Sequence, residues 1–519
     1  MRRRERTSMM TRHFAELPLT PCRTHTPLSQ CTFVRCLLGR IMQGGGVEGF
    51  RLPVARPVAE RRCLRTRFAA RRSTRTAAAL IDIVEQPLPW PKPFVDSFLA
   101  TYWQKKPLLV RSALPKFRGC LDSDDLAGLA LEEEVESRII VQHGAAAPTP
   151  WELRRGPFSE QDLTSLPETG YTLVVNAVDQ AVPHVAETLL PLFAWLPSWR
   201  VDDVQVSYAP PGGSVGPHSD QYDVFLLQAQ GRKEWRLSTD VGRYGPLVEG
   251  AFVEGLEVAI LRDFVAEETL VAHPGDMLYL PPGVAHYGIA LEEQQTYSIG
   301  FLAPTCRDLV LSYVAAAVEA DQRASERWAD GEWLKAASRP GELTADAIDH
   351  AVGIIASLPQ SREDIAQWFG SHVSLPCRGS REPAALDEPP TWEWVVEQLE
   401  EAGELCRHES TRCVFLPSAT LQPGRTGGTL FVDGQRFVVR SEAAARVAAE
   451  VADRRALEWG KLRALGVPVH LSADSDEAQV ETAELMVALI TAGFLFLPTD
   501  DEPEDVEDEG DARDVLVEL

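Results

Sequence analysis

Short apolar runs separated by glycine and proline dominate the chain between residues 80 and 305. In residues 203–208 (Asp-Val-Gln-Val-Ser-Tyr), apolar and polar positions alternate, which is the period of a half-buried β-strand. Similar runs predict further strands at 81–84, 108–110, 138–142, 171–176, 224–227, 235–237 and 277–280. Helical spacing predicts helices at 93–103, 122–130 and 184–195. A succession of short strands with such turns predicts a double-stranded β-helix, the jelly-roll or cupin architecture.

After residue 305 the apolar positions change to a helical period, which predicts helices at 307–323, 345–358 and 361–369. Proline, glycine and charged residues then mark a linker. Beyond the linker the pattern predicts a helix at 392–404, a strand at 412–416 and a hairpin at 429–439. Two more helices and a final strand at 493–497 follow the hairpin. The hairpin is the best-defined element, because Asp433-Gly434 lies between alternating apolar residues.

These patterns predict an α+β protein in several parts. The predicted parts are a leader (1–78), a β-helix domain (79–304), a helical segment (305–375), a linker (376–390), a second mixed domain (391–498) and an acidic tail (499–519). The tail from residue 500 onward holds 11 acidic residues, so we expect it to be disordered.

Composition limits the class of protein. A length of 519 residues predicts two or three domains. Hydrophobic residues make up 45% of the chain, but no apolar run is long enough to cross a bilayer, so we expect a globular protein without a membrane partner. The nine cysteines include no Cys-x-x-Cys pair and no His/Cys cluster at zinc spacing. We therefore expect a reducing compartment and neither a disulfide framework nor structural zinc.

Charge is divided unevenly between the leader and the rest of the chain. Residues 1–78 contain 17 Arg, no Lys and four acidic residues, and the other 34 basic and 72 acidic residues give the remainder a formal net charge of −38. An Arg-rich, acid-poor head predicts a transit peptide, and its low serine content favours a mitochondrion over a chloroplast; a disordered or untranslated extension is the alternative. The acidic body argues against direct nucleic-acid binding and suits a basic protein substrate, although acidity also promotes solubility.

Candidate chemistry is concentrated around His218-Ser-Asp220. On a strand, residues i and i+2 point to the same side, so these two side chains would share one space. Farther on, His286 follows a short apolar strand and the turn Pro281-Pro-Gly283. Two histidines and one carboxylate form the facial triad that binds Fe(II) and leaves positions open for a 2-oxo acid and dioxygen. A lone His-x-Asp is a weak signal, because polar residues near a strand end are the alternative explanation.

The surroundings of these residues strengthen the signal. A Pro/Gly-rich lead-in at 209–216 precedes them and a basic residue lies on the following strand. The whole layout resembles the bacterial ribosomal oxygenases, JmjC-type enzymes that hydroxylate an arginine of the sixteenth large-subunit ribosomal protein. The resemblance runs from about residue 85 to residue 498 and includes the segments 102–108, 125–129, 199–203, 297–301 and 367–370.

The resemblance also implies an architecture. It implies a JmjC-type jelly roll at 79–304, a helical segment at 305–375 that forms a homodimer, and a winged-helix-like domain at 391–498. Because this last domain lacks a basic recognition helix, we expect it to contact protein and not DNA.

For the cosubstrate, the resemblance implies that Lys233 binds the distal carboxylate of 2-oxoglutarate. A buried cation is costly unless it is paired, and a dicarboxylate supplies the pair. The bacterial family carries arginine at this position and related eukaryotic enzymes use lysine, so one ammonium replaces a bidentate guanidinium. Arg232 should face the opposite side of the strand. Ser298 is similar to a hydroxyl that related enzymes place near the same carboxylate, and an ordinary strand serine is the alternative.

The implied function is that of an Fe(II)- and 2-oxoglutarate-dependent dioxygenase that uses O2 to hydroxylate an arginine of a basic ribosomal protein. Its metal ligands would be His218, Asp220 and His286, with no further catalytic residue. Histidine hydroxylation and histone lysine demethylation are alternatives with the same chemistry, and a non-catalytic cupin binding module is an alternative of another class. The organellar leader and the lack of a chromatin-reading module disfavour demethylation, and the complete set of ligands disfavours the binding module.

Overall fold

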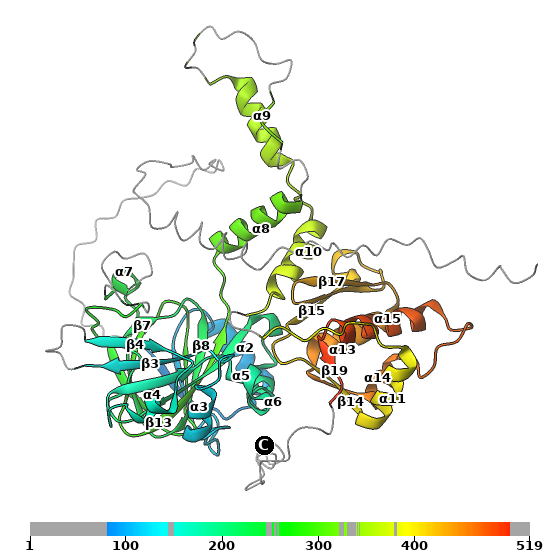
Figure 1. The fold of residues 1–519 in the computed structure, drawn as a ribbon. Helices are drawn as coiled ribbons and strands as arrows, with labels where there is room; N and C mark the ends of the chain where they lie inside the picture. Colours follow the sequence, from blue (N-terminus) through cyan, green and yellow to red (C-terminus); the bar gives the residue numbers. More distant parts are fainter. Residues whose placement is uncertain are drawn as a thin grey trace, which may run out of the picture. The chain divides into compact units, whose positions relative to one another are not determined.

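Two facing β-sheets form the region that the sequence predicts as a jelly roll, coloured blue to green in Figure 1. The structure, a computed structural model, describes residues 80–143, 150–244, 252–253, 256, 259–320, 326–329, 339, 341, 343–377 and 381–498. These residues all belong to one compact unit, residues 76–519. The predicted leader (1–78) and acidic tail (499–519) lie outside the described residues, and their roles stay predictions.

The larger sheet contains nine strands among the described residues. They are β1 (Asp82–Glu85), β2 (Leu108–Arg111), β3 (Ser137–Gln142), β4 (Trp151–Arg155), β5 (Tyr171–Val175), β6 (Val201–Ala209), β8 (Asp223–Gln230), β11 (Met277–Leu280) and β13 (Gln294–Phe301). Their order across the sheet is β1-β2-β11-β8-β13-β6-β5-β3-β4. The pair β1–β2 is parallel, and the other neighbours are antiparallel. Strands far apart in sequence thus become neighbours, as the predicted jelly roll requires.

The smaller sheet carries most of the predicted site. Its strands are β7 (His218–Ser219), β9 (Lys233–Ser238), β10 (Glu268–Ala272) and β12 (Ala285–Ala290). They pair antiparallel in the order β10-β9-β12-β7. The register sets His286 of β12 directly opposite His218 of β7. The topology therefore joins two histidines that are distant in sequence.

Strand alternation gives the larger sheet an outer and an inner face. Val204 and Val206 of β6 belong to the main core, which also contains Phe98 of the helix α2 (Lys92–Thr101). On the inner face, Leu226 of β8 clusters with Trp235 of β9, so apolar contacts hold the two sheets together. Polar side chains interrupt this packing between the sheets, and they form the site described below.

Several short helices accompany the sheets: α3 (Ser123–Leu129), α4 (Glu160–Thr164), α5 (Val178–Ala181), α6 (Pro183–Leu189), η1 (Leu190–Phe193), η2 (Ser198–Arg200) and α7 (Val241–Tyr244). The continuous helix predicted at 184–195 is wrong, because α6 ends at Leu189 and a 3-10 turn follows. Pro191 explains the break, since it lacks an N–H and its ring clashes with the preceding helical turn.

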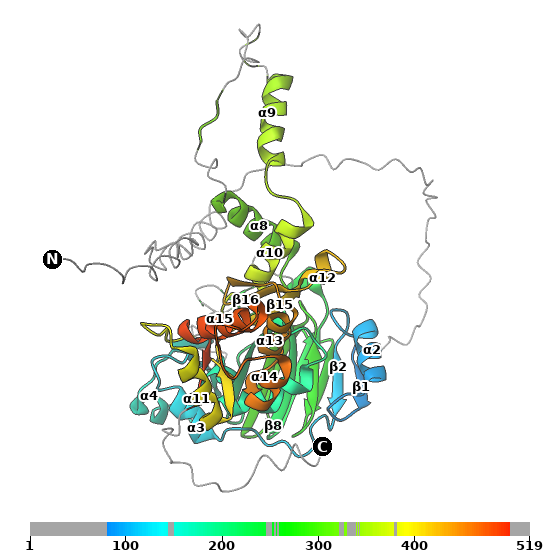
Figure 2. The ribbon, with the colours of Figure 1, turned by 90° about the vertical axis from the view of Figure 1, so that its right-hand side faces the viewer.

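Three helices follow the jelly roll, as predicted: α8 (Cys306–Ala320), α9 (Ala345–Ala356) and α10 (Arg362–Val373), drawn in green to yellow-green in Figure 2. Helices α8 and α9 leave large apolar side chains exposed, among them Val310 (60%) and Ile355 (67%). Gly370 of α10 lies against the buried ring of Phe431, which ties this helix to the last part of the chain.

The last part of the chain has its own core, centred on residues such as Val447 and Met486. Its elements are α11 (Trp392–Ala402), β14 (Glu404–Arg407), β15 (Cys413–Pro417), α12 (Ser418–Leu421), β16 (Gly428–Val432), β17 (Gln435–Val439), α13 (Glu442–Asp453), β18 (Ala456–Glu458), α14 (Trp459–Leu465), α15 (Glu477–Thr491) and β19 (Leu495–Phe496). The strands form two sheets, β18-β14-β19 and β15-β16-β17. The predicted Asp433-Gly434 hairpin is confirmed, with both residues at positive φ (47° and 82°) as a type I′ turn requires.

Two predictions for this part were incomplete. After the hairpin come three helices of seven or more residues, α13, α14 and α15, where the sequence predicts two. The short strands β14 and β18 were missed, because runs of three or four residues carry too little periodicity. Among the described residues, none of the helices combines the length and the apolar composition that a bilayer crossing requires.

Candidate metal centre

The three predicted metal ligands lie together between the sheets. The imidazole rings of His218 and His286 have centroids 4.2 Å apart. Asp220 follows β7, and its Oδ2 lies 3.6 Å from Nε2 of His286 and 3.9 Å from Nε2 of His218. One candidate ligand atom from each residue lies within 4.8 Å of the others. This spacing suits a single ion with bonds of about 2 Å to nitrogen and oxygen.

Hydrogen bonds to the backbone orient both imidazoles. Nδ1 of His218 is 2.9 Å from the carbonyl oxygen of Gly216, and Nδ1 of His286 is 3.0 Å from that of Val284. A carbonyl oxygen only accepts, so we assign the proton of each ring to Nδ1. Burial, with a contribution from His218, lowers the pKa of His286 to about 4. His286 therefore offers an unprotonated Nε2 toward Asp220, the form in which histidine binds a metal, and the same kind of Nδ1 hydrogen bond directs Nε2 of His218 toward Asp220.

A glycine joins the two loops that carry the ligands. The backbone N–H of Gly283 donates to the carbonyl oxygen of Asp220 at 2.7 Å. Gly283 has a φ of 83°, in the region that favours glycine. The Pro281-Pro-Gly283 turn thus fixes the start of β12 against the loop after β7, and His286 is held beside Asp220.

Lys233 is buried next to this centre with 6% of its surface exposed. Its Nζ lies 4.7 Å from the ring centroid of Trp235 and 3.4 Å from Oγ1 of Thr296 on the facing sheet. Burial alone lowers the pKa of Lys233 to about 7, and no acidic side chain pairs with it in the part of the chain that the structure describes. Arg232 faces away, as predicted, in an ion pair with Glu292 at 3.0 Å. A buried cation without a counter-ion fits the carboxylate of a ligand.

Two further features fit an anion beside Lys233. Gly288 of β12 makes room for the lysine, since a Cβ there would lie 2.7 Å from Cε of Lys233. Thr296 Oγ1 lies within hydrogen-bond distance of the amide oxygens of Gln228 and Gln294, at 3.1 and 2.7 Å. The amide Nε2 of Gln294 is buried without a hydrogen-bond partner among the described residues. A carboxylate would accept from this amide as well as from the lysine.

The sequence singled out Ser298 for this carboxylate, but the hydroxyl beside Lys233 belongs to Thr296. Ser298 lies on the same face of β13, paired with Gln205 of β6 and Leu226 of β8. Its contact with a cosubstrate stays a prediction. Alternation indicates that the side chains at positions 296 and 298 share a face of β13. Which of the two lies beside Lys233 depends on how β13 lies across from β9 in the facing sheet, and alternation does not determine that.

A second acidic group lies farther along the inner face. Asp203 of β6 accepts a hydrogen bond from the backbone N–H of Ala177 at 3.0 Å, and burial, aided by nearby Asp179 and Asp202, raises its pKa to about 7. The charge of Asp220, burial and, more weakly, the charge of Asp203 raise the pKa of Tyr222 well above its usual value. No sequence motif singles out Asp203 as a site residue, although its alternation with Val204 and Val206 assigns it to the inner face.

On the same strand, Gln205 accepts a hydrogen bond from Nη2 of Arg138 at 2.9 Å. The smaller sheet thus contributes the candidate histidine ligands and Lys233, and the inner face of the larger sheet contributes the partly buried carboxylate of Asp203. Such a carboxylate binds a cationic side chain well, because charge-assisted hydrogen bonds are stronger where water is scarce.

Comparisons with known proteins place the chain beside ribosomal oxygenases. A JmjC domain family model matches residues 188–309. The chain is 34% identical over 352 residues to the ribosomal protein uL16 3-hydroxylase of Escherichia coli. The aligned region covers 67% of this chain and 86% of that protein. It is 38% identical over 218 residues to a probable ribosomal oxygenase of Haemophilus influenzae, covering 41% of this chain and 51% of that protein. The structure of YcfD, a ribosomal oxygenase from Escherichia coli in complex with cobalt and 2-oxoglutarate, matches with a TM-score of 0.61 and 27% identity, covering 78% of this chain and 97% of that one.

Proposed function

Because this chain belongs to the JmjC-domain family of ribosomal oxygenases, we propose that it is an Fe(II)- and 2-oxoglutarate-dependent dioxygenase that hydroxylates an arginine of a large-subunit ribosomal protein. One observation carries the proposal: the facial triad and a buried lysine, which has no acidic partner among the described residues, lie on the same pair of facing sheets. When bound, Fe(II) supplies oxidation of a C–H bond by O2, and the overall reaction turns C–H, O2 and 2-oxoglutarate into C–OH, succinate and CO2.

The protein's own groups divide the work between them. His218, Asp220 and His286 would hold the iron through the two Nε2 atoms and one carboxylate oxygen. Lys233 would pair with the distal carboxylate of 2-oxoglutarate, with the Gln294 amide as a second donor. The apolar packing around Trp235 excludes water from this ion pair and so strengthens it. Ser298 remains a candidate for a further contact with the cosubstrate.

We infer arginine as the target residue from Asp203. A guanidinium presents five donors and stays charged at any pH that the protein tolerates, so it pairs well with this carboxylate. Histidine is largely neutral at pH 7 and gains less from it. A basic ribosomal protein also suits the strongly acidic body of the chain.

Succinate formation tests the proposal. The full-length protein, Fe(II) and 2-oxoglutarate are incubated with uL16 of Escherichia coli, and succinate is measured beside hydroxylated uL16. We expect one succinate per hydroxylation for the wild type. Asp220→Ala should give no detectable turnover with an unchanged circular dichroism spectrum, because one of three ligands is lost. Asp203→Asn should keep 2-oxoglutarate binding and lower kcat/KM for uL16 about tenfold or more. An Asp220→Ala protein that still formed succinate would contradict the assignment.

We also propose that residues 305–375 join two copies of the chain. The support is the row of exposed apolar side chains on α8 and α9, which comprises Val310, Leu311, Val314, Val318, Ile348, Val352, Ile354 and Ile355. Apolar surface of this kind on neighbouring helices suits an interface between copies. A winged-helix-like domain at 391–498, after the jelly roll at 79–304 and the linker at 376–390, is supported by the three helices α13 to α15 and by β18, the short strand between α13 and α14 that joins the sheet β18-β14-β19.

A further inference from the structure

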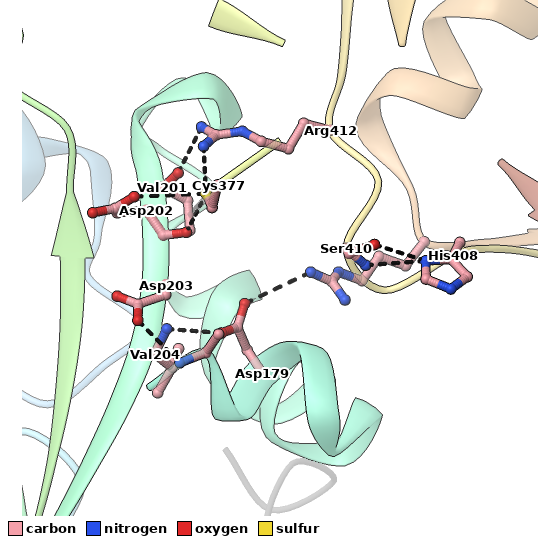
Figure 3. A network of polar contacts seen from close by, with 11 residues as sticks. Asp179, Val201, Asp202, Asp203, Val204, Cys377, His408, Ser410 and Arg412 are labelled. Carbon is pink, nitrogen blue, oxygen red and sulfur yellow. Dashed lines mark hydrogen bonds and ion pairs between the residues drawn. The ribbon is translucent and has the colours of Figure 1, made fainter. Parts of the chain in front are cut away.

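The start of β6 is bound by groups from the last part of the chain. Arg412, the residue before β15, donates from Nη2 to the carbonyl oxygen of Trp199 at 2.8 Å and to that of Val201 at 2.7 Å. Figure 3 shows Arg412 reaching toward Val201. The thiol of Cys377 donates to the carbonyl oxygen of Asp202 at 3.0 Å. Three backbone carbonyls at the root of one strand of the jelly roll are therefore held from outside the jelly roll.

A second contact restrains the same strand from its other side. Asp179 of α5 accepts a hydrogen bond from the backbone N–H of Val204 at 2.8 Å. Its other carboxylate oxygen lies 3.9 Å from Nη2 of Arg455, which follows α13. Burial raises the pKa of Asp179 and Arg455 acts against this rise, so the arginine helps to keep the carboxylate ionised. Figure 3 shows Asp179 and Asp203 on either side of Val204.

Arg412 is itself fixed by the hairpin of the last domain. Its backbone N–H donates to Oδ1 of Asp433 at 2.7 Å, and its carbonyl oxygen accepts from the backbone N–H of Asp433 at 3.1 Å. Asp433 begins the two-residue turn between β16 and β17. A rigid turn therefore fixes the backbone position from which the guanidinium reaches the start of β6.

We propose that Arg412 is a positioning residue for substrate hydroxylation, holding β6 so that Asp203 and Gln205 face the substrate. The proposal rests on the proposed function, because it gives the inner face of β6 to the substrate. The restrained backbone at 199–204 includes Asp203 itself and ends one residue before Gln205. A shift of about 1 Å in a substrate-binding group costs up to about a hundredfold in rate. The planar guanidinium fixes the directions of its N–H groups toward both carbonyls and toward Sγ of Cys377, whereas the ammonium of lysine rotates on a flexible stem and would hold the backbone less rigidly.

Hydrogen exchange of the full-length protein tests the restraint without any substrate. We expect Arg412→Ala to accelerate amide exchange in the peptide that covers 199–209 and to leave the peptides around His218 and His286 unchanged. Arg412→Lys, which keeps the charge and the aliphatic stem, should not restore slow exchange. Arg436→Ala is the matched control, because that arginine of the same hairpin makes one exposed hydrogen bond to Ser371. Unchanged exchange at 199–209 in Arg412→Ala would overturn the proposal.

Kinetics with uL16 test the consequence. Arg412→Ala and Arg412→Lys should lower kcat/KM for uL16 by about tenfold or more and form succinate in excess over hydroxylated product, while KM for 2-oxoglutarate changes less than about twofold. An equal loss toward uL16 and 2-oxoglutarate would indicate general loss of structure and would also overturn the proposal. If the wild type does not oxidise uL16 at all, the proposed function fails, and the exchange data alone decide whether Arg412 holds β6.

Discussion

Lys233 shows how burial prepares a single residue for its ligand. With no acidic side chain beside it in the described part of the chain, its pKa is lowered from 10.5 to about 7, because burial disfavours the ammonium. Below pH 7 the side chain is already charged, so pH has little effect on its pairing with a carboxylate. Above pH 7 the lysine must take up a proton when the ligand binds, and the affinity for 2-oxoglutarate should fall about tenfold per pH unit.

Titration calorimetry with Co(II) and 2-oxoglutarate between pH 7 and pH 9 checks this prediction. Buffers with different ionisation enthalpies should reveal proton uptake above pH 7. Lys233→Arg is the control, because its guanidinium stays charged and should bind with an affinity that does not depend on pH. A wild-type affinity that is constant across this range would show that Lys233 does not bind the anion.

Gly288 should be as important for the cosubstrate as the lysine beside it. In Gly288→Ala the new Cβ would lie 2.6 Å from the ring of Trp235 and 2.7 Å from Cε of Lys233, so one of them must move. We expect KM for 2-oxoglutarate to rise about tenfold or more, as measured by succinate formation. Gly300→Ala is the control, since its Cβ would meet its nearest atom at an ordinary 3.5 Å. Equal KM values for the two variants would contradict this account of the lysine site.

At the scale of elements, α10 depends on a glycine to approach β16. A Cβ at Gly370 would lie 2.3 Å from the ring of Phe431, which is fully buried. Replacing glycine by alanine within a helix gains about 1 kcal/mol. Overpacking a core costs about 1–3 kcal/mol, and a contact this short belongs at the upper end. We therefore expect Gly370→Ala to lower the free energy of unfolding by about 1–2 kcal/mol.

Urea denaturation measures this difference. Gly128→Ala in α3 is the matched control, because a Cβ there has no atom within 4 Å and only the helix gain remains. Stabilisation by Gly370→Ala equal to that of the control would show that α10 does not pack against Phe431 as described.

The sequence predicts elements better than their pairings. The strands around the site follow from short apolar runs, and His218 and Asp220 follow from their i, i+2 spacing. Predicting His286 as a ligand required the Pro281-Pro-Gly283 turn as an additional signal, because His286 reaches His218 and Asp220 only through the pairing of β12 with β7. Thr296 and Asp203 could not be chosen over other residues of alternating strands, since their roles depend on registers between distant strands. The prediction of one helix over 184–195 was wrong, because Pro191 ends the helix although the apolar positions keep a helical period.

At the scale of the whole molecule, the exposed apolar faces of α8 and α9 predict a homodimer. Val352 and Ile355 of α9 are 56% and 67% exposed in one chain. Introducing a buried charge into such an interface costs several kcal/mol, so Val352→Glu/Ile355→Glu should be monomeric. Light scattering after gel filtration of the full-length protein measures the mass. Val265→Glu, at a position that is 54% exposed in the jelly-roll domain, should stay dimeric. Identical masses for the double variant and the wild type would contradict the proposed interface.

We propose that the triad and Lys233 together serve to hydroxylate an arginine of a ribosomal protein. Mass spectrometry of uL16 after incubation with the full-length protein, Fe(II), 2-oxoglutarate and 18O2 tests this proposal. We expect one labelled oxygen on a single arginine, which is absent when 2-oxoglutarate is withheld or when the protein carries Asp220→Ala. Unmodified uL16 after 2-oxoglutarate has been converted to succinate, or labelled oxygen on a residue other than arginine, would contradict it.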